Sequence, residues 1–275
     1  MDWSLVLASQ GIEHVIEQSE ESGWALVVAA PDHEKALAHI RQYRLENRHW
    51  RWRRPVFQPG WVFDWRSAIW VLMTISFYWW SDARTALRGL GEMDGSALAR
   101  GEWWRLFTAM WLHADPGHLA MNAVFGLVFL GLAMGRYGPG AGLLAAYLAG
   151  AGGNVATWLG YGESQRGLGA SGMVMGALGL LSVQSFSLLG QRNFNALRRF
   201  TGTILGGLLL FVLLGLNPEA DVVAHLGGLV AGMLLGSLIS LDSRLAHRPW
   251  INLAAGILFA ALVILPWLRA LGWAG

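Results

Sequence analysis

From residue 61 onward the chain alternates between long apolar stretches and short polar connections. Seven stretches are apolar: residues 67–81, 119–135, 137–162, 167–191, 200–218, 222–241 and 249–268. An α-helix needs about 20 apolar residues to cross the hydrocarbon core of a bilayer, and several of these stretches are near that length. The pattern therefore predicts an all-α polytopic membrane protein with seven spanning helices.

The first 48 residues follow a different pattern, which predicts a small α+β domain. Residues 4–8 and 23–29 are short apolar runs bounded by turn residues, as in strands, and residues 11–18 alternate loosely as a third strand would. Apolar residues then recur at helical spacing from Ala36 to Leu45. We expect residues 1–48 to be an appended module, because so short a chain forms only a marginal core.

A basic segment connects this module to the first apolar stretch. Residues 41–54 contain six arginines and one glutamate, and arginines beside a membrane span usually mark its cytoplasmic end. The later connections agree, since the same side receives Arg136, Arg192, Arg198, Arg199, Arg244 and Arg248. We therefore predict a basic linker over residues 49–60, a cytoplasmic N-terminus and, after seven crossings, a C-terminus on the opposite side.

Composition favours a membrane protein and excludes several classes of function. The 275 residues are 54% hydrophobic and 14% charged, with 16 tryptophans and 36 glycines, whereas soluble domains carry about 25% charged residues. A net charge of +2 is too small to indicate a nucleic-acid partner. The absence of cysteine excludes disulfides, thiolate metal sites and a cysteine nucleophile.

Four polar residues are expected at one depth in the membrane. His118 and Asn122 begin the second apolar stretch, Ser171 begins the fourth, and His225 begins the sixth. These stretches run in the same direction, so their first turns lie near the same, outer face. Polar residues at this depth are costly and normally face a protein interior or a water-filled cavity. Taken alone, Asn122 would be a hydrogen bond between helices, His225 a buried histidine bonded to a carbonyl, and Ser171 a packing residue. The four together favour a site.

The residue types in this group suit acyl transfer. A serine hydroxyl becomes a nucleophile when a neutral histidine removes its proton, which assigns those roles to Ser171 and His225. His118, Asn122 and the backbone N–H of Ser171 are available donors for the oxyanion. The nearest carboxylate to His225 is Asp221, one turn toward solvent. A Ser-His dyad is therefore favoured over a triad.

Other chemistries fit the sequence less well. A zinc site would draw on His113, His118 and His225, but the chain has no His-Glu-x-x-His pair and no Asp or Glu in the second to sixth apolar stretches. The same lack of intramembrane carboxylates argues against an aspartyl protease and a proton-coupled transporter. We therefore expect no metal and no cofactor.

Four motifs occur in a fixed order. Trp104-Arg105 lies in the long outer connection, His-Ala-Asp-Pro-Gly-His-Leu-Ala-Met-Asn covers residues 113–122, Gly-Ala-Ser-Gly covers 169–172, and Ala-His-Leu-Gly-Gly covers 224–228. Together they resemble the signatures of the rhomboid family of intramembrane serine proteases. The resemblance covers about residues 61–241 and implies a rhomboid-like bundle of six core transmembrane helices. Residues 242–275 would add one C-terminal helix.

The resemblance also implies roles for individual residues. Ser171 would be the nucleophile, and His225 the general base and then the acid for the leaving amine. His118 and Asn122, with the backbone of Ser171, would form the oxyanion hole. Gly169 would let the loop before the nucleophile come close to it.

Further residues would support the site or depart from the family pattern. Arg105 would anchor the interfacial loop, and Gly228 and Gly232 would let the fourth and sixth helices pack closely. Met175 stands one turn after the nucleophile, where many members carry an aromatic ring, so we expect altered pKa tuning but retained activity. Residues 131–135 lack the glutamate with which many bacterial members brace the first loop.

These features predict an intramembrane serine endopeptidase that cleaves single-pass membrane proteins in or near their transmembrane segment. By resemblance, a small residue precedes the scissile bond, and residues 200–216 form a lateral gate. The alternative is a proteolytically inactive rhomboid-like protein that binds transmembrane helices, although the intact Ser171 and His225 argue against it. The topology suits a bacterial inner membrane, with a cytoplasmic N-terminus and a periplasmic C-terminus. The natural substrate and the oligomeric state stay open.

Overall fold

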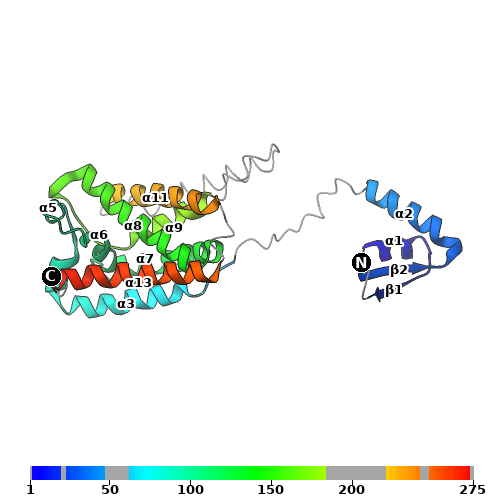
Figure 1. Ribbon diagram of the computed structural model, residues 1–275, viewed down its shortest axis with the longest axis horizontal. Coiled ribbons are helices and arrows are strands. Elements are labelled where there is room, and N and C mark those ends of the chain that lie inside the picture. The colour runs from blue at the N-terminus through cyan, green and yellow to red at the C-terminus, as the bar shows by residue number, and fades with distance from the viewer. Residues whose placement is uncertain (1, 20–22, 47–61, 184–220, 242–247, 273–275) are drawn as a thin grey trace. The chain divides into compact units, whose positions relative to one another are not determined.

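The computed structural model describes residues 2–19, 23–46, 62–183, 221–241 and 248–272. The chain divides into two compact units, Met1–Gly60 and Trp61–Gly275, and helices dominate the second unit (Figure 1). Each unit has its own buried apolar cluster. The predicted fifth apolar stretch, residues 200–218, and the proposed gate within it lie outside the described residues.

The N-terminal unit combines helices with a two-stranded antiparallel sheet. Its elements are α1 Asp2–Ser9, β1 His14–Ser19, β2 Gly23–Val28, the 3₁₀ turn η1 Ala30–Asp32 and α2 His33–Glu46. The strands pair from His14↔Val28 to Ser19↔Gly23, and Leu7, Ile12 and Ala36 form the buried centre.

One expectation for this unit was wrong. Residues 4–8 were expected to form a strand, but they lie within helix α1. A short apolar run fits a buried strand and a buried helix equally well, and here a helical turn brings Leu7 into the core, where it is 1% exposed. The strand expected within residues 11–18 is found as β1, and the helix expected from Ala36 to Leu45 is found as α2.

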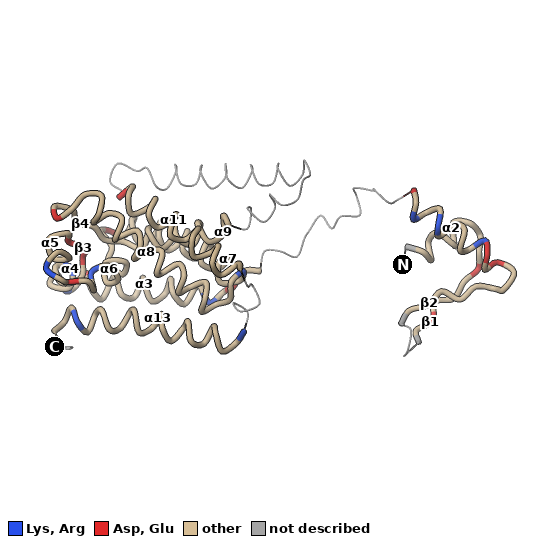
Figure 2. The backbone as a smooth tube through the Cα atoms, turned by 45° about the horizontal axis from the view of Figure 1, so that its top comes forward, with Lys and Arg blue, Asp and Glu red and all other residues tan. Residues whose placement is uncertain are grey.

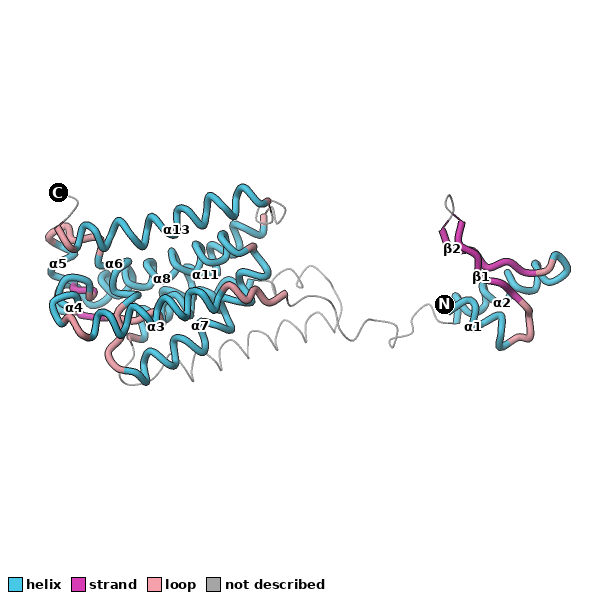
Figure 3. The backbone as a smooth tube through the Cα atoms, turned by 90° about the horizontal axis from the view of Figure 1, so that it is seen from below, coloured by secondary structure: helices cyan, strands magenta, loops and turns pink. Residues whose placement is uncertain are grey.

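The second unit is a helical bundle with short connecting elements at its ends. Six helices make up its described body: α3 Ser67–Asp82, α7 Pro116–Tyr137, α8 Pro139–Tyr161, α9 Ser171–Ser182, α11 Val222–Ser240 and α13 Pro249–Ala270. Figure 3 shows α3, α7, α11 and α13 lying roughly along one direction. Among the described residues of this unit, the charged ones lie at the helix ends and in the connections, and the bodies of these six helices are uncharged (Figure 2).

Three of the described helices are both long enough and apolar enough to cross a bilayer, namely α7, α11 and α13. α3 has only 16 residues, and α8 has 23 but contains many glycines and alanines. α9 is a shorter apolar helix over the residues that are described. Its first helical residue is Ser171, whereas the apolar pattern placed the start of this stretch at Gly167, which lies in a short strand.

Glycine faces bring α8, α9 and α11 into close contact. A Cβ added at Gly228 would collide with the carbonyl oxygen of Gly172, and one added at Gly232 would collide with that of Gly176. A Cβ at Gly153 of α8 would meet the carbonyl of Ala224 in the same way. The backbones of these helices therefore touch directly, as small residues allow in membrane bundles.

The connection between α3 and α7 is a folded structure. It contains α4 Thr85–Gly91, β3 Met93–Asp94, α5 Gly95–Ala99, α6 Arg105–Thr108 and the 3₁₀ turn η3 Ala109–Trp111. β3 pairs with β4 Arg166–Gly167, which follows the 3₁₀ turn η4 Gly162–Ser164. This small sheet links the connection to the segment just before Ser171.

The C-terminal helix α13 packs on α8. Asn252 Oδ1 accepts hydrogen bonds from the backbone N–H groups of Gly140 (3.0 Å) and Ala141 (3.2 Å) at the start of α8. Trp267 lies against Gly91 of the connection. The helix therefore braces α8 and the connection, which both contribute to the surroundings of the cavity described next.

Candidate active site

A cavity of about 750 Å³ in the second unit brings the four predicted polar residues together. His118 and Asn122 from α7, Ser171 from α9 and His225 from α11 all line its wall. His225 and Asn122 are 3% and 5% exposed, while His118 and Ser171 are half-buried. The predicted neighbours Gly169 and Met175 line the same cavity. These side chains come from three helices and the loop before α9.

Ser171 is the first residue of α9, and the residue before it gives no side-chain cap. The first N–H groups of a helix have no intrahelical partner and carry the positive end of the helix dipole. Ser171 and Gly172 both line the cavity, so the hydroxyl lies in the first turn that carries these backbone donors. A developing negative charge at this point would be stabilised.

Gly169 shapes the loop that precedes the serine. Its φ is +121°, a conformation that favours glycine, and its N–H donates to the carbonyl of Ala109 (2.9 Å). A Cβ at this position would lie 2.6 Å from both Cε1 and Nε2 of His118. The Nε2 edge of the His118 ring therefore rests directly against Gly169.

His118 and Asn122 are held by the start of α7. Asp115 caps this helix, because its Oδ1 accepts from the His118 backbone N–H at 2.9 Å, and this hydrogen bond lowers the pKa of Asp115 below its usual range. Asn122 Nδ2 donates one hydrogen to the carbonyl of His118 (3.1 Å), which leaves its second hydrogen to donate elsewhere.

Asp221 stands at the start of α11, four residues before His225, and caps this helix. Its Oδ1 accepts from the backbone N–H of Ala224 (2.9 Å) and so caps α11. Its Oδ2 accepts from the hydroxyl of Thr157 on α8 (2.8 Å). Both carboxylate oxygens thus fix the first turn of α11 relative to α8, and this turn carries His225.

Arg105 lies in the connection between α3 and α7, and it is not among the residues that line the cavity. It is 8% exposed and donates to the carbonyls of Gly89 (2.9 Å) and Glu92 (2.7 Å) and to the carboxylate of Glu102 (2.7 Å). A buried guanidinium with three acceptors of this kind holds loop segments together. Met175, Gly228 and Gly232 are likewise found within or beside the packed contact of α9 with α11.

Sequence reasoning missed several residues near the cavity. Asn154 of α8 lines it and donates to the carbonyl of Leu106 (2.7 Å); its only signal was an amide inside a long uncharged stretch. Arg88 and Arg166 stand at the wall and form ion pairs with Glu92 at 3.7 and 3.6 Å. The residues that line this cavity do not include His113, which lies behind His118.

Residues 131–135, which lack the expected glutamate, pack against the segment just before α3. The backbone N–H of Asp64 donates to the carbonyl of Gly131 (2.9 Å), and Phe63 lies against Gly131. Gly135 touches the backbone of Val62. Gly131 and Gly135 thus leave room for residues 62–64, which precede α3, to pack against α7.

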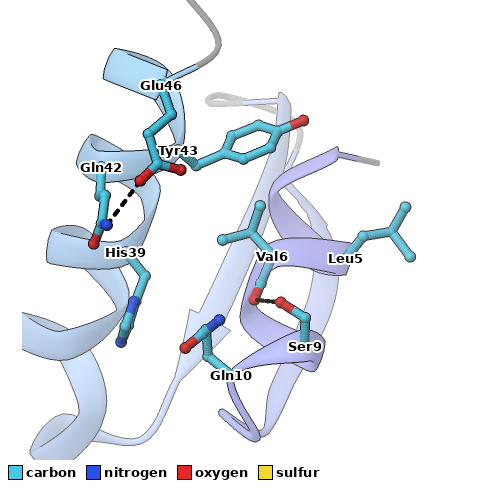
Figure 4. Close-up of a pocket in the computed structure, with 8 residues that line it drawn as sticks. All are labelled: Leu5, Val6, Ser9, Gln10, His39, Gln42, Tyr43 and Glu46. Carbon is cyan, nitrogen blue, oxygen red and sulfur yellow. Dashed lines mark hydrogen bonds between the residues drawn. The ribbon is translucent and has the colours of Figure 1, made fainter.

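A second hollow of about 420 Å³ lies in the N-terminal unit. Figure 4 shows its lining, which comes from α1, α2 and the residue after α1: Leu5, Val6, Ser9, Gln10, His39, Gln42, Tyr43 and Glu46. Gln42 donates to Glu46 (2.8 Å) and Ser9 to the carbonyl of Val6 (2.8 Å). Within the described parts of the chain, no three His, Asp or Glu side chains group as a metal site requires.

Comparison with known proteins gives a consistent result. Residues 100–242, more than half of the chain, match the family model described as Rhomboid domain. The chain is 30% identical over 184 residues to Rhomboid protease GluP of Bacillus subtilis, covering 65% of this chain and 34% of that protein. It is 33% identical over 171 residues to RHOMBOID-like protein 4 of Arabidopsis thaliana, covering 60% and 41%.

A third relative is closer in length. The Putative rhomboid protease YdcA of Bacillus subtilis is 32% identical over 144 residues, which cover 51% of this chain and 69% of that protein. The chain spans less than half the length of GluP and of RHOMBOID-like protein 4. From the match of its core and from its apolar helices, this protein is a multi-pass membrane protein that belongs to the rhomboid family.

Proposed function

We propose that the protein is an intramembrane serine endopeptidase that uses Ser171 and His225 as a catalytic dyad. The observation that carries the proposal is one cavity lined by a hydroxyl at a helix start, a buried imidazole and the side chains of His118 and Asn122. Membership of the rhomboid family supports it, because relatives such as GluP carry the name rhomboid protease.

The reaction would proceed through an acyl-enzyme. Ser171 Oγ attacks the scissile carbonyl carbon while His225 accepts the hydroxyl proton. The C–N bond then breaks, and His225 gives that proton to the leaving amine. Water next attacks the ester and loses a proton to His225, which returns it to Ser171 Oγ as the carboxylic acid product leaves.

The oxyanion would be stabilised by donors on one side of the cavity. The backbone N–H of Ser171, Nε2–H of His118 and the second amide hydrogen of Asn122 have suitable chemistry for this role. The edge of His118 rests on Gly169, two residues before the nucleophile. Each such donor is worth roughly a hundredfold to a thousandfold in kcat.

A dyad accounts for the contacts of the neighbouring carboxylate. Both oxygens of Asp221 already accept hydrogen bonds, from Ala224 and from Thr157. We assign Asp221 the role of placing the first turn of α11, while the packing of α11 on α9 brings His225 to the cavity. Met175, 2% exposed, fills the space one turn below Ser171.

The substrate class follows from the setting. A peptide bond inside a helix has its carbonyl in an intrahelical hydrogen bond, so a transmembrane substrate must unwind locally before attack. We propose single-pass membrane proteins as substrates, cut in or near the transmembrane segment after a small residue. A cytoplasmic N-terminus, a periplasmic C-terminus and a bacterial inner membrane complete the proposal.

The decisive experiment uses the purified protein in detergent with a model transmembrane substrate. We expect Ser171→Ala and His225→Ala each to lower kcat by roughly a thousandfold or more, since members of such a unit fail together. Ser182→Ala is the matched control, because this buried serine of the same helix donates to the carbonyl of Leu178 one turn earlier and does not line the cavity. A fluorophosphonate probe should label the wild type and Ser182→Ala, but not Ser171→Ala.

The same experiment separates the alternative. A proteolytically inactive rhomboid-like protein would bind the substrate helix with equal affinity in all variants and would release no product. Turnover by Ser171→Ala at the wild-type rate would rule out the proposed nucleophile.

A further inference from the structure

His113 is a buried histidine for which the proposed mechanism has no use. It lies between η3 and α7, two residues before the capping Asp115, and is 6% exposed. Its ring nitrogens make no well-formed hydrogen bond among the described residues, although the backbone of Trp111 lies close enough to interact with the ring. Burial is the main cause that lowers the pKa of His113 to about 3, so the ring is neutral and carries one donor and one acceptor.

Burying the ring nitrogens of His113 lowers the stability of the fold unless a small polar molecule forms hydrogen bonds with them. A buried donor or acceptor without a partner destabilises a protein by about 1–3 kcal/mol. Phenylalanine at this position would fill the same space without that penalty. Buried polar atoms of this kind in folded proteins usually bind an ordered water.

The neighbour of His113 is the proposed oxyanion donor. The rings of His113 and His118 meet edge to face, with centroids 5.2 Å apart and planes at 67°. The Nε2 edge of His118 faces Gly169, because a Cβ there would come within 2.6 Å of it. The Nδ1 of His118 is therefore on the part of the ring that does not face Gly169.

The protonation of His118 decides whether it works as a donor. A neutral imidazole carries its proton on one nitrogen only, and the hydrogen bond made by the other nitrogen selects which. For Nε2–H to point at the oxyanion, Nδ1 has to accept a hydrogen bond. Among the described residues the hydrogen bonds at His118 involve its backbone N–H and carbonyl, so the donor for Nδ1 has to come from elsewhere.

We propose that His113 is a positioning residue that holds one water molecule, and that this water donates to Nδ1 of His118 and so fixes its Nε2–H tautomer. The inference rests on the proposed function, because it assigns His118 to the oxyanion hole. One water with hydrogen bonds of about 2.8–3.0 Å bridges nitrogens up to about 5–6 Å apart, and the centroids of the two rings are 5.2 Å apart. The water accepts from the N–H of His113 and donates to His118.

The test combines kinetics with a direct measurement of the tautomer. His113→Phe keeps the ring packing but removes the water ligand, and His113→Gln keeps a polar group that can hold water. We expect His113→Phe to lower kcat by roughly tenfold to a hundredfold with KM unchanged, and His113→Gln to recover part of that loss. Trp267→Phe is the control, because it also removes a buried ring N–H without a partner among the described residues.

The tautomer is read from ¹⁵N chemical shifts of the His118 ring, assigned by its loss in His118→Asn. We expect Nε2–H in the wild type and a mixture of tautomers in His113→Phe. The same measurement in Ser171→Ala does not depend on activity, so a failed proposal for the protease and a failed proposal for His113 give different results. An Nδ1–H tautomer in the wild type, or an unchanged tautomer in His113→Phe, would overturn the inference. So would equal kcat losses in His113→Phe and His113→Gln accompanied by a fall in Tm.

Discussion

Gly169 places a bare stretch of backbone against the ring of His118. Its φ is +121°, and the ring leaves no space for a Cβ. The residue gives the loop before Ser171 a path that no other amino acid can follow without strain. The shape of the cavity therefore depends on the lack of a side chain at Gly169 as well as on the polar groups that line the wall.

Gly169→Ala should therefore damage catalysis more than folding. The new methyl group would displace His118, and we expect kcat to fall by roughly a hundredfold, as for the loss of an oxyanion donor. The rate of fluorophosphonate labelling measures the effect. Gly256→Ala in α13 is the control, since a Cβ there meets nothing within 4 Å; equal labelling of both variants would contradict the assigned role of the loop.

At the scale of elements, the contact of α9 with α11 sets the spacing of the proposed dyad. Gly228, Gly232 and Gly236 lie at intervals of four residues and face the backbone of α9. Residues four apart share one face of a helix. The carbonyls of Gly172 and Gly176 occupy the space where side chains would otherwise stand.

Gly232→Val should force the two helices apart. We expect a loss of about 1–3 kcal/mol in the free energy of unfolding, as for overpacked cores, together with a loss of substrate cleavage. Thermal unfolding in detergent provides the measurement, with Gly256→Val as the variant of matched size. A full rate of cleavage at an unchanged Tm would show that the helices do not need this contact.

The sheet of β3 with β4 ties the connection between α3 and α7 to the loop before Ser171. Arg166 of β4 forms ion pairs with Asp94 (3.3 Å) and Glu92 (3.6 Å). Asp94 also caps α5, and the hydrogen bond from the Ser96 hydroxyl is the main cause that lowers the pKa of Asp94. The charged form of Asp94 therefore stabilises the folded state.

The stabilisation by Asp94 should depend on pH in a defined direction. Its folded pKa lies below the value of 3.8 for an unperturbed aspartate, so the contribution is present above about pH 4 and is lost as the pH falls through the folded pKa. Asp94→Asn keeps a good helix cap and should cost about 0.2–1 kcal/mol at pH 7. The difference in Tm from the wild type should shrink at pH 3; a constant difference would contradict the role of the charge.

Across the whole molecule, the order of motifs was enough to predict the family and the helices that carry the polar residues. Ser171, His225 and His118 each lie near the first turn of a helix. This shared position explains why they could be grouped before the cavity was known. The helix α1, the pairing of β3 with β4 and the contact of His113 with His118 could not be predicted. Each depends on neighbours distant in sequence or on backbone hydrogen bonds, which leave no periodic pattern.

The division into two units makes a prediction for the N-terminal residues. Each unit has its own buried cluster, and every described residue that lines the cavity belongs to the second unit. A shortened chain that begins at Trp61 should therefore cleave a model substrate within about threefold of the full chain. Purified proteins of both lengths, assayed side by side at equal concentration, test this. A loss of cleavage with an unchanged Tm would assign the N-terminal unit a part in the reaction.

The direct backbone contact between α9 and α11 also has a mechanical consequence. Helices separated by long side chains can slide as those side chains change rotamer, but helices locked carbonyl to glycine have little such freedom. α9 and α11 should therefore move as one rigid body within the lipid bilayer. When a thinner or thicker bilayer changes the tilt of the two helices, Ser171 and His225 should turn together. Membranes of different thickness should alter how a substrate helix approaches this pair before they alter the spacing within it.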